Sequence, residues 1–116
     1  MLFYSLKDFE SKTSGLKLIG REEEIDCARR MQSGDKAARE RLIEGYLPMV
    51  VSHTKRWPDD WRIFGMVCYC LSALEKAVDS FNFLQDSEPF VHRLSWALRQ
   101  ACTRYIAYHR NPPEDR

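Results

Sequence analysis

Residues 63–81 read IFGMVCYCLSALEKAVDSF. Large apolar residues recur in this stretch at intervals of three or four positions: Phe64, Val67, Leu71, Leu74 and Val78. This interval is typical of one face of an α-helix. The stretch therefore predicts a long helix, buried along one side, around which the rest of the chain packs.

Shorter helices are predicted upstream. Arg21 and the three glutamates after it begin one helix, because the macrodipole favours negative charge in the first turn. Ser33-Gly34 ends it. Asp35 is a preferred N-cap residue and opens a second helix. A further short helix is expected around residues 4–12.

Two loops and a final helix complete the predicted pattern. Gly45 and Pro48 interrupt the second helix, and Pro48 is acceptable only where a new first turn begins. Residues 57–61, with Trp57 and Trp61 at their ends, are a loop by composition, as are residues 82–89. The last helix is expected over residues 90–108.

Composition supports a single globular domain. The chain has 116 residues, of which 44% are hydrophobic and 30% charged, and this balance argues against disorder. Lys plus Arg is 18 against 17 for Asp plus Glu, so any basic binding surface must be local. Five glycines and five prolines are few for a many-turned β-sandwich. The expected fold is all-α, a compact bundle of about four main helices.

Membrane and export classes are not favoured. No apolar run approaches the ~18–20 residues needed to cross a bilayer. The N-terminus lacks the cleavage-site pattern of a signal peptide. We therefore expect a cytoplasmic protein with no membrane partner.

Metal and catalytic sites are not expected either. The cysteines lack the paired spacing of a zinc site and are predicted to be buried free thiols: Cys27, Cys68, Cys70 and Cys102. The histidines lie far apart in the chain without a nucleophile or carboxylate in a recognisable arrangement: His53, His92 and His109. There is no Gly-rich phosphate loop. We expect no enzyme activity, no metal or other cofactor, and no small-molecule substrate.

The last predicted helix has two unlike faces. On a wheel of roughly 100° per residue one broad face is apolar, with Phe90 and Tyr108 at its edge: Leu94, Ala97, Leu98, Ala101, Cys102 and Tyr105. The opposite face carries four arginines and no acidic residue: Arg93, Trp96, Arg99, Gln100, Thr103, Arg104 and Arg110. Arginine pairs with phosphates, glutamine reads base edges and tryptophan stacks on bases. The face is therefore either a nucleic-acid interface or a solvated helix surface.

An ordered series of short motifs carries a family resemblance over about residues 18–108. The series comprises REEEI (21–25), ARRMQSGD (28–35), ARERLIE (38–44), LPMVV (47–51), Lys55-Arg56, KAVD (76–79) with Phe81, Trp96, LRQA (98–101) and Thr103-Arg104. In this order and spacing it resembles the second domain of bacterial RNA polymerase sigma factors. The resemblance implies a helical domain that holds the clamp helices of core RNA polymerase and that melts and reads the promoter −10 element.

The resemblance also implies roles for single residues. Gln100 and Thr103 fall on positions that read the base pair at the upstream edge of the −10 element, and Arg99 and Arg104 flank them as phosphate contacts. Trp96 matches the first of two adjacent aromatics that support strand opening. Phe90 matches a further aromatic of the melting segment.

The sequence departs from the family pattern at the DNA-melting positions. Ala97 stands where the family has its second tryptophan, and Arg93 stands where an aromatic helps to hold a flipped base. Residues 83–88 include Asp86 and Glu88, which would repel the phosphates of a melted strand.

A second departure lies in the helix that would bind polymerase. The family has polar residues where this chain has Gly65, Cys68 and Tyr69. Either polymerase is contacted differently, or this helix binds a replacement protein partner, or its apolar residues pack in the core. The candidate partner-binding residues are Met66, Tyr69, Leu71 and Glu75.

The resemblance also suggests a domain organisation. Residues 1–17 form an N-terminal segment, residues 18–110 the domain similar to sigma domain two, and residues 111–116 a short polar tail. No helix-turn-helix for the −35 element follows Asn111, so we expect a divergent, truncated sigma-like regulator that needs a partner for promoter choice. The alternative is a protein-interaction module on a sigma-like fold that has lost DNA and polymerase binding.

Overall fold

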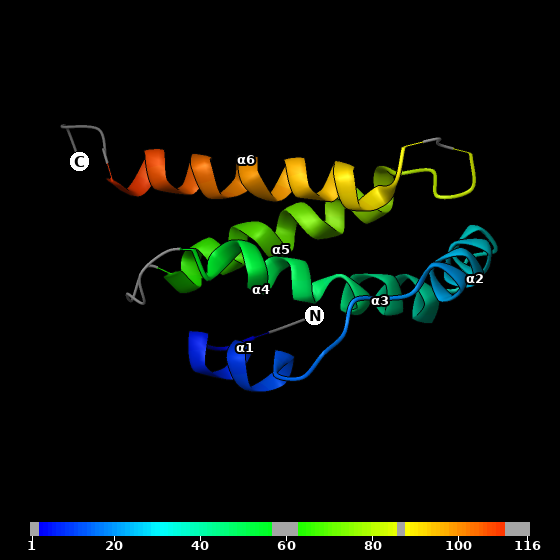
Figure 1. Ribbon diagram of the computed structural model, residues 1–116, viewed down its shortest axis with the longest axis horizontal. Coiled ribbons are helices and arrows are strands. Elements are labelled where there is room, and N and C mark those ends of the chain that lie inside the picture. The colour runs from blue at the N-terminus through cyan, green and yellow to red at the C-terminus, as the bar shows by residue number, and fades with distance from the viewer. Residues whose placement is uncertain (1–2, 57–62, 86–87, 111–116) are drawn as a thin grey trace.

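The computed structural model describes residues 3–56, 63–85 and 88–110 and confirms an all-α fold (Figure 1). These ranges contain six helices. They are α1 (Leu6–Thr13), α2 (Arg21–Gln32), α3 (Lys36–Gly45), α4 (Leu47–Thr54), α5 (Ile63–Ser80) and α6 (Phe90–Arg110). None of the helices in these ranges combines the length and the apolar character that a membrane span requires.

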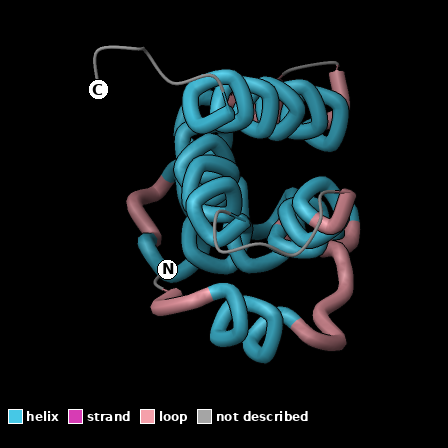
Figure 2. The backbone as a smooth tube through the Cα atoms, turned by 90° about the vertical axis from the view of Figure 1, so that its left-hand side faces the viewer, coloured by secondary structure: helices cyan, strands magenta, loops and turns pink. Residues whose placement is uncertain are grey.

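The helices form an elongated bundle of 47 × 28 × 22 Å. The long helices α5 and α6 pack against each other along one side of it, as Figures 1 and 2 show. Helices α3 and α4 run end to end beneath α5, and α1 covers the far side of α4. Helix α2 packs on α3 at one end of the bundle. Helix α5, whose apolar spacing predicted a buried helix, contacts four of the five other helices.

Local signals set the helix boundaries as predicted. The Asp35 carboxylate accepts hydrogen bonds from the backbone N–H groups of Ala37 and Ala38, so Asp35 is the N-cap of α3. Gly34 has φ 92° and turns the chain between α2 and α3, a conformation that glycine adopts without steric cost. Ser5 caps α1 in the same way as Asp35 caps α3, through a hydrogen bond from the Asp8 N–H.

The number of helices exceeds the four or so main helices that were predicted. Tyr46 separates α3 from α4, and Pro48 lies in the first turn of α4, where its missing N–H leaves no helical bond unmade. The interruption expected at Gly45 and Pro48 is therefore a complete break. Helix α1 is the short helix that was expected around residues 4–12. The predicted loop over residues 57–61, including Trp57 and Trp61, and the tail at 111–116 lie outside the described residues.

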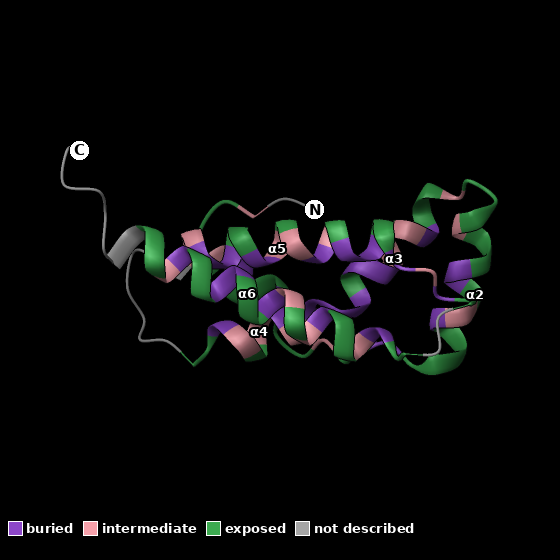
Figure 3. Ribbon diagram, turned by 90° about the horizontal axis from the view of Figure 1, so that it is seen from above, coloured by how far each residue is buried: buried purple, intermediate pink, exposed green. Residues whose placement is uncertain are grey.

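One hydrophobic core runs through all of these elements (Figure 3). It includes Phe9 from α1 and Ile19 from the segment before α2, together with buried residues of α2 to α6. Residues near the N-terminus thus pack on the same core as the rest. The boundary between an N-terminal segment (residues 1–17) and the sigma-like domain (residues 18–110) stays a prediction that rests on the family resemblance.

Two bidentate ion pairs join helices at the surface. Arg39 on α3 donates from Nε and Nη2 to the Asp79 carboxylate on α5, at 2.6 and 2.9 Å. Arg41 on α3 donates to Glu23 on α2, at 2.6 and 3.0 Å. These ion pairs therefore connect α3 to both α5 and α2.

Candidate nucleic-acid interface

Helix α6 divides into the two faces that its sequence predicts. Leu94, Leu98, Cys102 and Tyr105 are buried against the bundle, whereas Tyr108 at the edge is exposed. The residues of the opposite face are all exposed, and Trp96 is exposed over 58% of its surface. We call this the α6 polar face: Arg93, Trp96, Arg99, Gln100, Thr103 and Arg104. The Arg110 side chain lies outside the described part.

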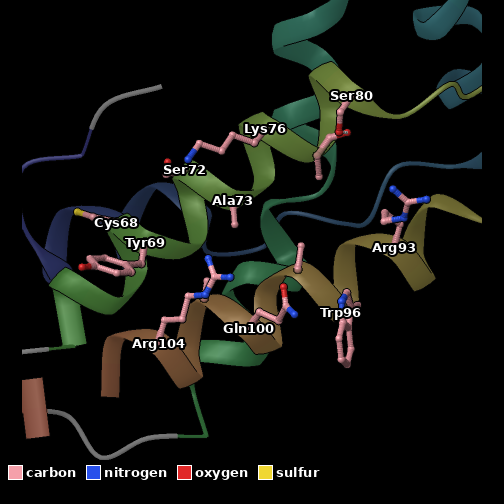
Figure 4. A pocket seen from close by; sticks show the side chains of 13 residues that line it. Cys68, Tyr69, Ser72, Ala73, Lys76, Ser80, Arg93, Trp96, Gln100 and Arg104 are labelled. Atoms are coloured by element: carbon pink, nitrogen blue, oxygen red, sulfur yellow. Dashed lines mark hydrogen bonds between the residues drawn. The ribbon is translucent and has the colours of Figure 1, made fainter. Parts of the chain in front are cut away.

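A groove of about 620 Å³ lies between this face and α5 (Figure 4). Helix α5 contributes one wall and α6 the other. Small residues of both helices lie between the walls: Ala73 and Ala77 from α5, Ala97 and Ala101 from α6. The polar and aromatic side chains that line the groove are Tyr69, Ser72, Lys76 and Ser80 from α5, and Arg93, Trp96, Gln100 and Arg104 from α6. We call this the α5–α6 groove.

The α5–α6 groove has a positive lining. Lys76 extends from the α5 wall, and Arg93 and Arg104 extend from the α6 wall. No acidic side chain is found among the described residues that line it. The Arg93 guanidinium lies 5.7 Å from the centre of the Phe81 ring, a cation–π arrangement that holds this charge beside the groove. Such a surface attracts phosphate groups, since cations without nearby carboxylates leave a local positive potential.

Phe90 does not belong to this surface. Its side chain is only 2% exposed and is surrounded by other aromatic rings. Its ring centre lies 4.8 Å from that of Tyr46, 5.1 Å from Phe81 and 4.7 Å from Phe83. The expectation that Phe90 contacts DNA is therefore corrected. Phe90 begins α6 at an edge of the wheel, and the rings of Phe81 and Phe83 pack against it there.

The four candidate partner-binding residues do not form one surface either. Met66 is buried in the core at 2% exposure. Leu71 is half-buried and packs against the core. Tyr69 lies roughly 160° around α5 from Leu71 at 100° per residue, so these two side chains cannot contact one flat partner. Glu75 is not among the described residues that line the groove.

Gly65 is explained by the packing of α5 against α6. A Cβ atom at this position would lie 2.8 Å from Cε1 of the Tyr105 ring and even closer to its hydroxyl oxygen. The Tyr105 ring in turn packs edge-on against Tyr69, with ring centres 5.1 Å apart. The glycine that departs from the family's polar pattern thus accommodates an aromatic ring from α6.

The cysteines divide between core and surface. Cys27, Cys70 and Cys102 are buried as predicted, but Cys68 is exposed, so that part of the prediction is wrong. Cys68 and Cys70 point to different sides of α5 because two residues span roughly 200° of a helix. The Cys70 and Cys102 sulfur atoms lie 3.5 Å apart. This contact, together with burial, raises the pKa of the Cys70 thiol and keeps it protonated.

The α5 wall of the groove was not identified from the sequence. Its polar residues Ser72, Lys76 and Ser80 recur every four positions, on the side of α5 away from Leu74 and Val78. This interval was visible in the sequence. It could not be assigned to a groove without knowing that α6 packs beside it.

The curated proteins that are similar to this chain include three RNA polymerase sigma factors. The protein SigA of Clostridium acetobutylicum is 40% identical over 91 residues, which are 78% of this chain and 24% of that protein. SigA of Listeria monocytogenes and SigA of Listeria innocua are each 38% identical over 99 residues, or 79% of this chain and 26% of theirs. Most of this chain is a sigma-factor-family region.

The similarity of this chain to sigma factors rests on its sequence identity with individual proteins. No family model matches the chain. The chain spans about a quarter of the length of the curated relatives that it matches.

Proposed function

We propose that this sigma-factor region acts in transcription initiation by binding promoter DNA through the α6 polar face and core RNA polymerase through other surfaces of the bundle. It performs no catalysis of its own, because a sigma factor directs polymerase instead of transforming a substrate.

The DNA-binding half of the proposal is supported by the side chains on the α6 polar face. The α6 polar face presents Arg99, Gln100, Thr103 and Arg104 together on the exposed side of a 21-residue helix. Three of the groove-lining side chains beside it are cations, and no described lining residue is acidic. Arginines at this spacing bind phosphates, and Gln100 and Thr103 between them are suited to base edges. Trp96, exposed at the same face, adds one ring for stacking on a base.

A double substitution tests this half. We expect Gln100→Ala with Arg104→Ala to weaken binding of a −10-type promoter duplex by about tenfold or more, since each lost base or phosphate contact costs about 1–3 kcal/mol. The matched control is Arg29→Ala with Gln32→Ala, which removes the same two residue types from exposed positions on α2. Fluorescence anisotropy at one fixed salt concentration measures both. Equal affinities for the two variants would contradict the assignment of the DNA site.

The polymerase-binding half is tested separately. We expect the immobilised chain to capture purified core RNA polymerase in moderate salt, and to capture the subunit that carries the clamp helices when the subunits are offered singly. If the chain captures neither core RNA polymerase nor this subunit, the polymerase-binding half of the proposal is contradicted. The DNA-binding half is then decided by the anisotropy measurement alone.

The second candidate function is a protein-interaction module on the same fold. It is favoured by the exposed Tyr69, at 41% of its surface, and by the exposed Cys68 beside it, where a polar polymerase contact was expected. On this account the chain binds a replacement protein and no DNA. Absence of detectable duplex binding by the unmodified chain would favour this candidate over the first.

A further inference from the structure

Four aromatic rings near the start of α6 are buried in the core. Phe81, Phe83 and Phe90 are each less than 9% exposed, and Tyr46 joins them at 3%. Their ring centres lie 4.7 to 5.1 Å apart in edge-on and tilted pairs, a preferred packing for buried rings. None of these four rings can stack on an unpaired base unless the core around it is taken apart.

The groove itself offers no row of neighbouring rings. Four alanines lie between its walls: Ala73, Ala77, Ala97 and Ala101. In Figure 4 Trp96 points away from α5, and Tyr69 lies at the opposite end of the groove. Tyr69 is already paired edge-on with Tyr105. Proteins that hold single strands stack successive bases on aromatic side chains, and two separated rings do not form such a platform.

What the groove does offer is positive charge on both walls. Lys76 on α5 lies across from the α6 wall that carries Arg93 and Arg104, and no described lining residue is acidic. Duplex DNA carries one negative charge per ~1.7 Å of its axis, and its binding releases more counterions per neutralised phosphate than binding of a single strand does. A cationic groove that lacks a stacking platform therefore discriminates in favour of the duplex.

We infer that the α5–α6 groove takes one phosphate backbone of a closed DNA duplex, bound by Lys76 from one side and by Arg93 and Arg104 from the other, and that it binds unpaired DNA weakly. This inference rests on the proposed function, because it specifies the form of DNA that the same site accepts. It assigns to Lys76 a phosphate contact. It also separates DNA binding from strand opening.

The test compares a fluorescently labelled promoter duplex with each of its two strands, titrated with the full chain in the same buffer. We expect the duplex to bind several-fold more tightly than either strand, because each neutralised phosphate of a duplex releases more counterions. Lys76→Ala should weaken duplex binding several-fold. Lys36→Ala, which removes an exposed lysine at the start of α3, should leave it unchanged.

A substitution that adds a ring gives the converse result. Ala97→Trp places an indole beside Trp96 at the groove, and we expect it to raise single-strand affinity while duplex affinity stays the same or falls. Circular dichroism verifies that the variant keeps its helical content, and Ala97→Phe serves as the smaller replacement if it does not.

The outcomes separate this inference from the proposed function. Equal or tighter binding of a single strand by the unmodified chain would overturn the inference and leave the proposed function standing. An unchanged duplex affinity for Lys76→Ala would overturn the placement of the phosphate backbone. Binding of neither duplex nor strand would overturn both the inference and the DNA-binding half of the proposed function.

Discussion

At the scale of single residues, close packing explains why glycine occurs at two positions. Gly65 leaves room for the ring of Tyr105, and Gly45 leaves room for Ile19, whose Cβ would lie 2.6 Å from a Cβ at position 45. The Ile19 N–H also donates to the Gly45 carbonyl oxygen at 2.9 Å. Gly45 ends α3 and Gly65 lies in the first turn of α5, and at both positions the close approach leaves no room for a Cβ atom.

Gly65→Ala should destabilise the fold by about 1–2 kcal/mol, because overpacking costs about 1–3 kcal/mol and the improved helix propensity returns only part of it. Urea denaturation followed by circular dichroism measures the change. Gly20→Ala is the control, since a Cβ there meets no atom within 4 Å. A Gly65→Ala variant as stable as the unmodified chain would show that the Tyr105 ring moves aside without cost.

The variant Phe90→Leu tests whether the Phe90 side chain stabilises the core or contacts DNA. We expect a loss of stability of about 1–2 kcal/mol, as for other reductions of a buried side chain, with duplex affinity unchanged at a temperature where the variant is folded. Arg99→Ala, at an exposed position on the same helix, should have the reverse pattern. A Phe90→Leu variant with weakened duplex binding and full stability would restore Phe90 to the interface.

At the scale of helices, surface ion pairs hold α3 against its neighbours. The hydrogen bonds and positive charge of Arg39 lower the pKa of Asp79 below its ordinary value of 3.8. Because Asp79 is half exposed, the pair contributes only about 0.5 kcal/mol. Its importance lies in joining α3 to α5, which are distant in sequence.

The pH dependence of this ion pair follows from the direction of the shift. The contribution is complete above the unfolded-state pKa and is lost as pH falls through the lowered native pKa. We therefore expect Asp79→Asn to be less stable than the unmodified chain at pH 7, with the difference beginning to shrink near pH 4 and disappearing only below the lowered native pKa. Thermal unfolding across this range measures it, with Asp26→Asn as the control within a single helix. A difference that persists unchanged at low pH would contradict the assignment.

The sequence predicts most helices correctly for a physical reason. Periodic apolar residues and caps such as Asp35 act over a few positions, so α2, α3, α5 and α6 can be assigned without knowing the fold. The two faces of α6 follow from the same periodicity. The positions of Phe90, Met66 and Lys76 depend on which helix packs beside which, and local patterns do not contain that information.

At the scale of the whole molecule, the distribution of charge matters more than its sum. The net charge of +1 gives no reason to expect DNA binding. The fold nevertheless collects cations along the α6 polar face and the α5–α6 groove, and it pairs many carboxylates with arginines elsewhere, as in the pairs of Arg39 and Arg41. The resulting field is local and is sensitive to salt.

Salt dependence tests this distribution. The logarithm of duplex affinity should fall linearly with the logarithm of salt concentration, and Arg104→Ala should reduce the slope by about 1, because one fewer phosphate is neutralised. Arg29→Ala, which lies on α2 away from the groove, should leave the slope unchanged. Equal reductions for both variants would indicate a diffuse interaction with the whole surface.

The most direct test of the DNA site maps where DNA touches the protein. A promoter duplex that carries photoreactive bases is crosslinked to the full chain, and the modified peptides are identified by mass spectrometry. We predict crosslinks within residues 93–104 of α6, and on the α5 wall around Lys76. Crosslinks concentrated on α1 or α2, with none on α6, would contradict the assignment of the α6 polar face as the DNA-binding surface.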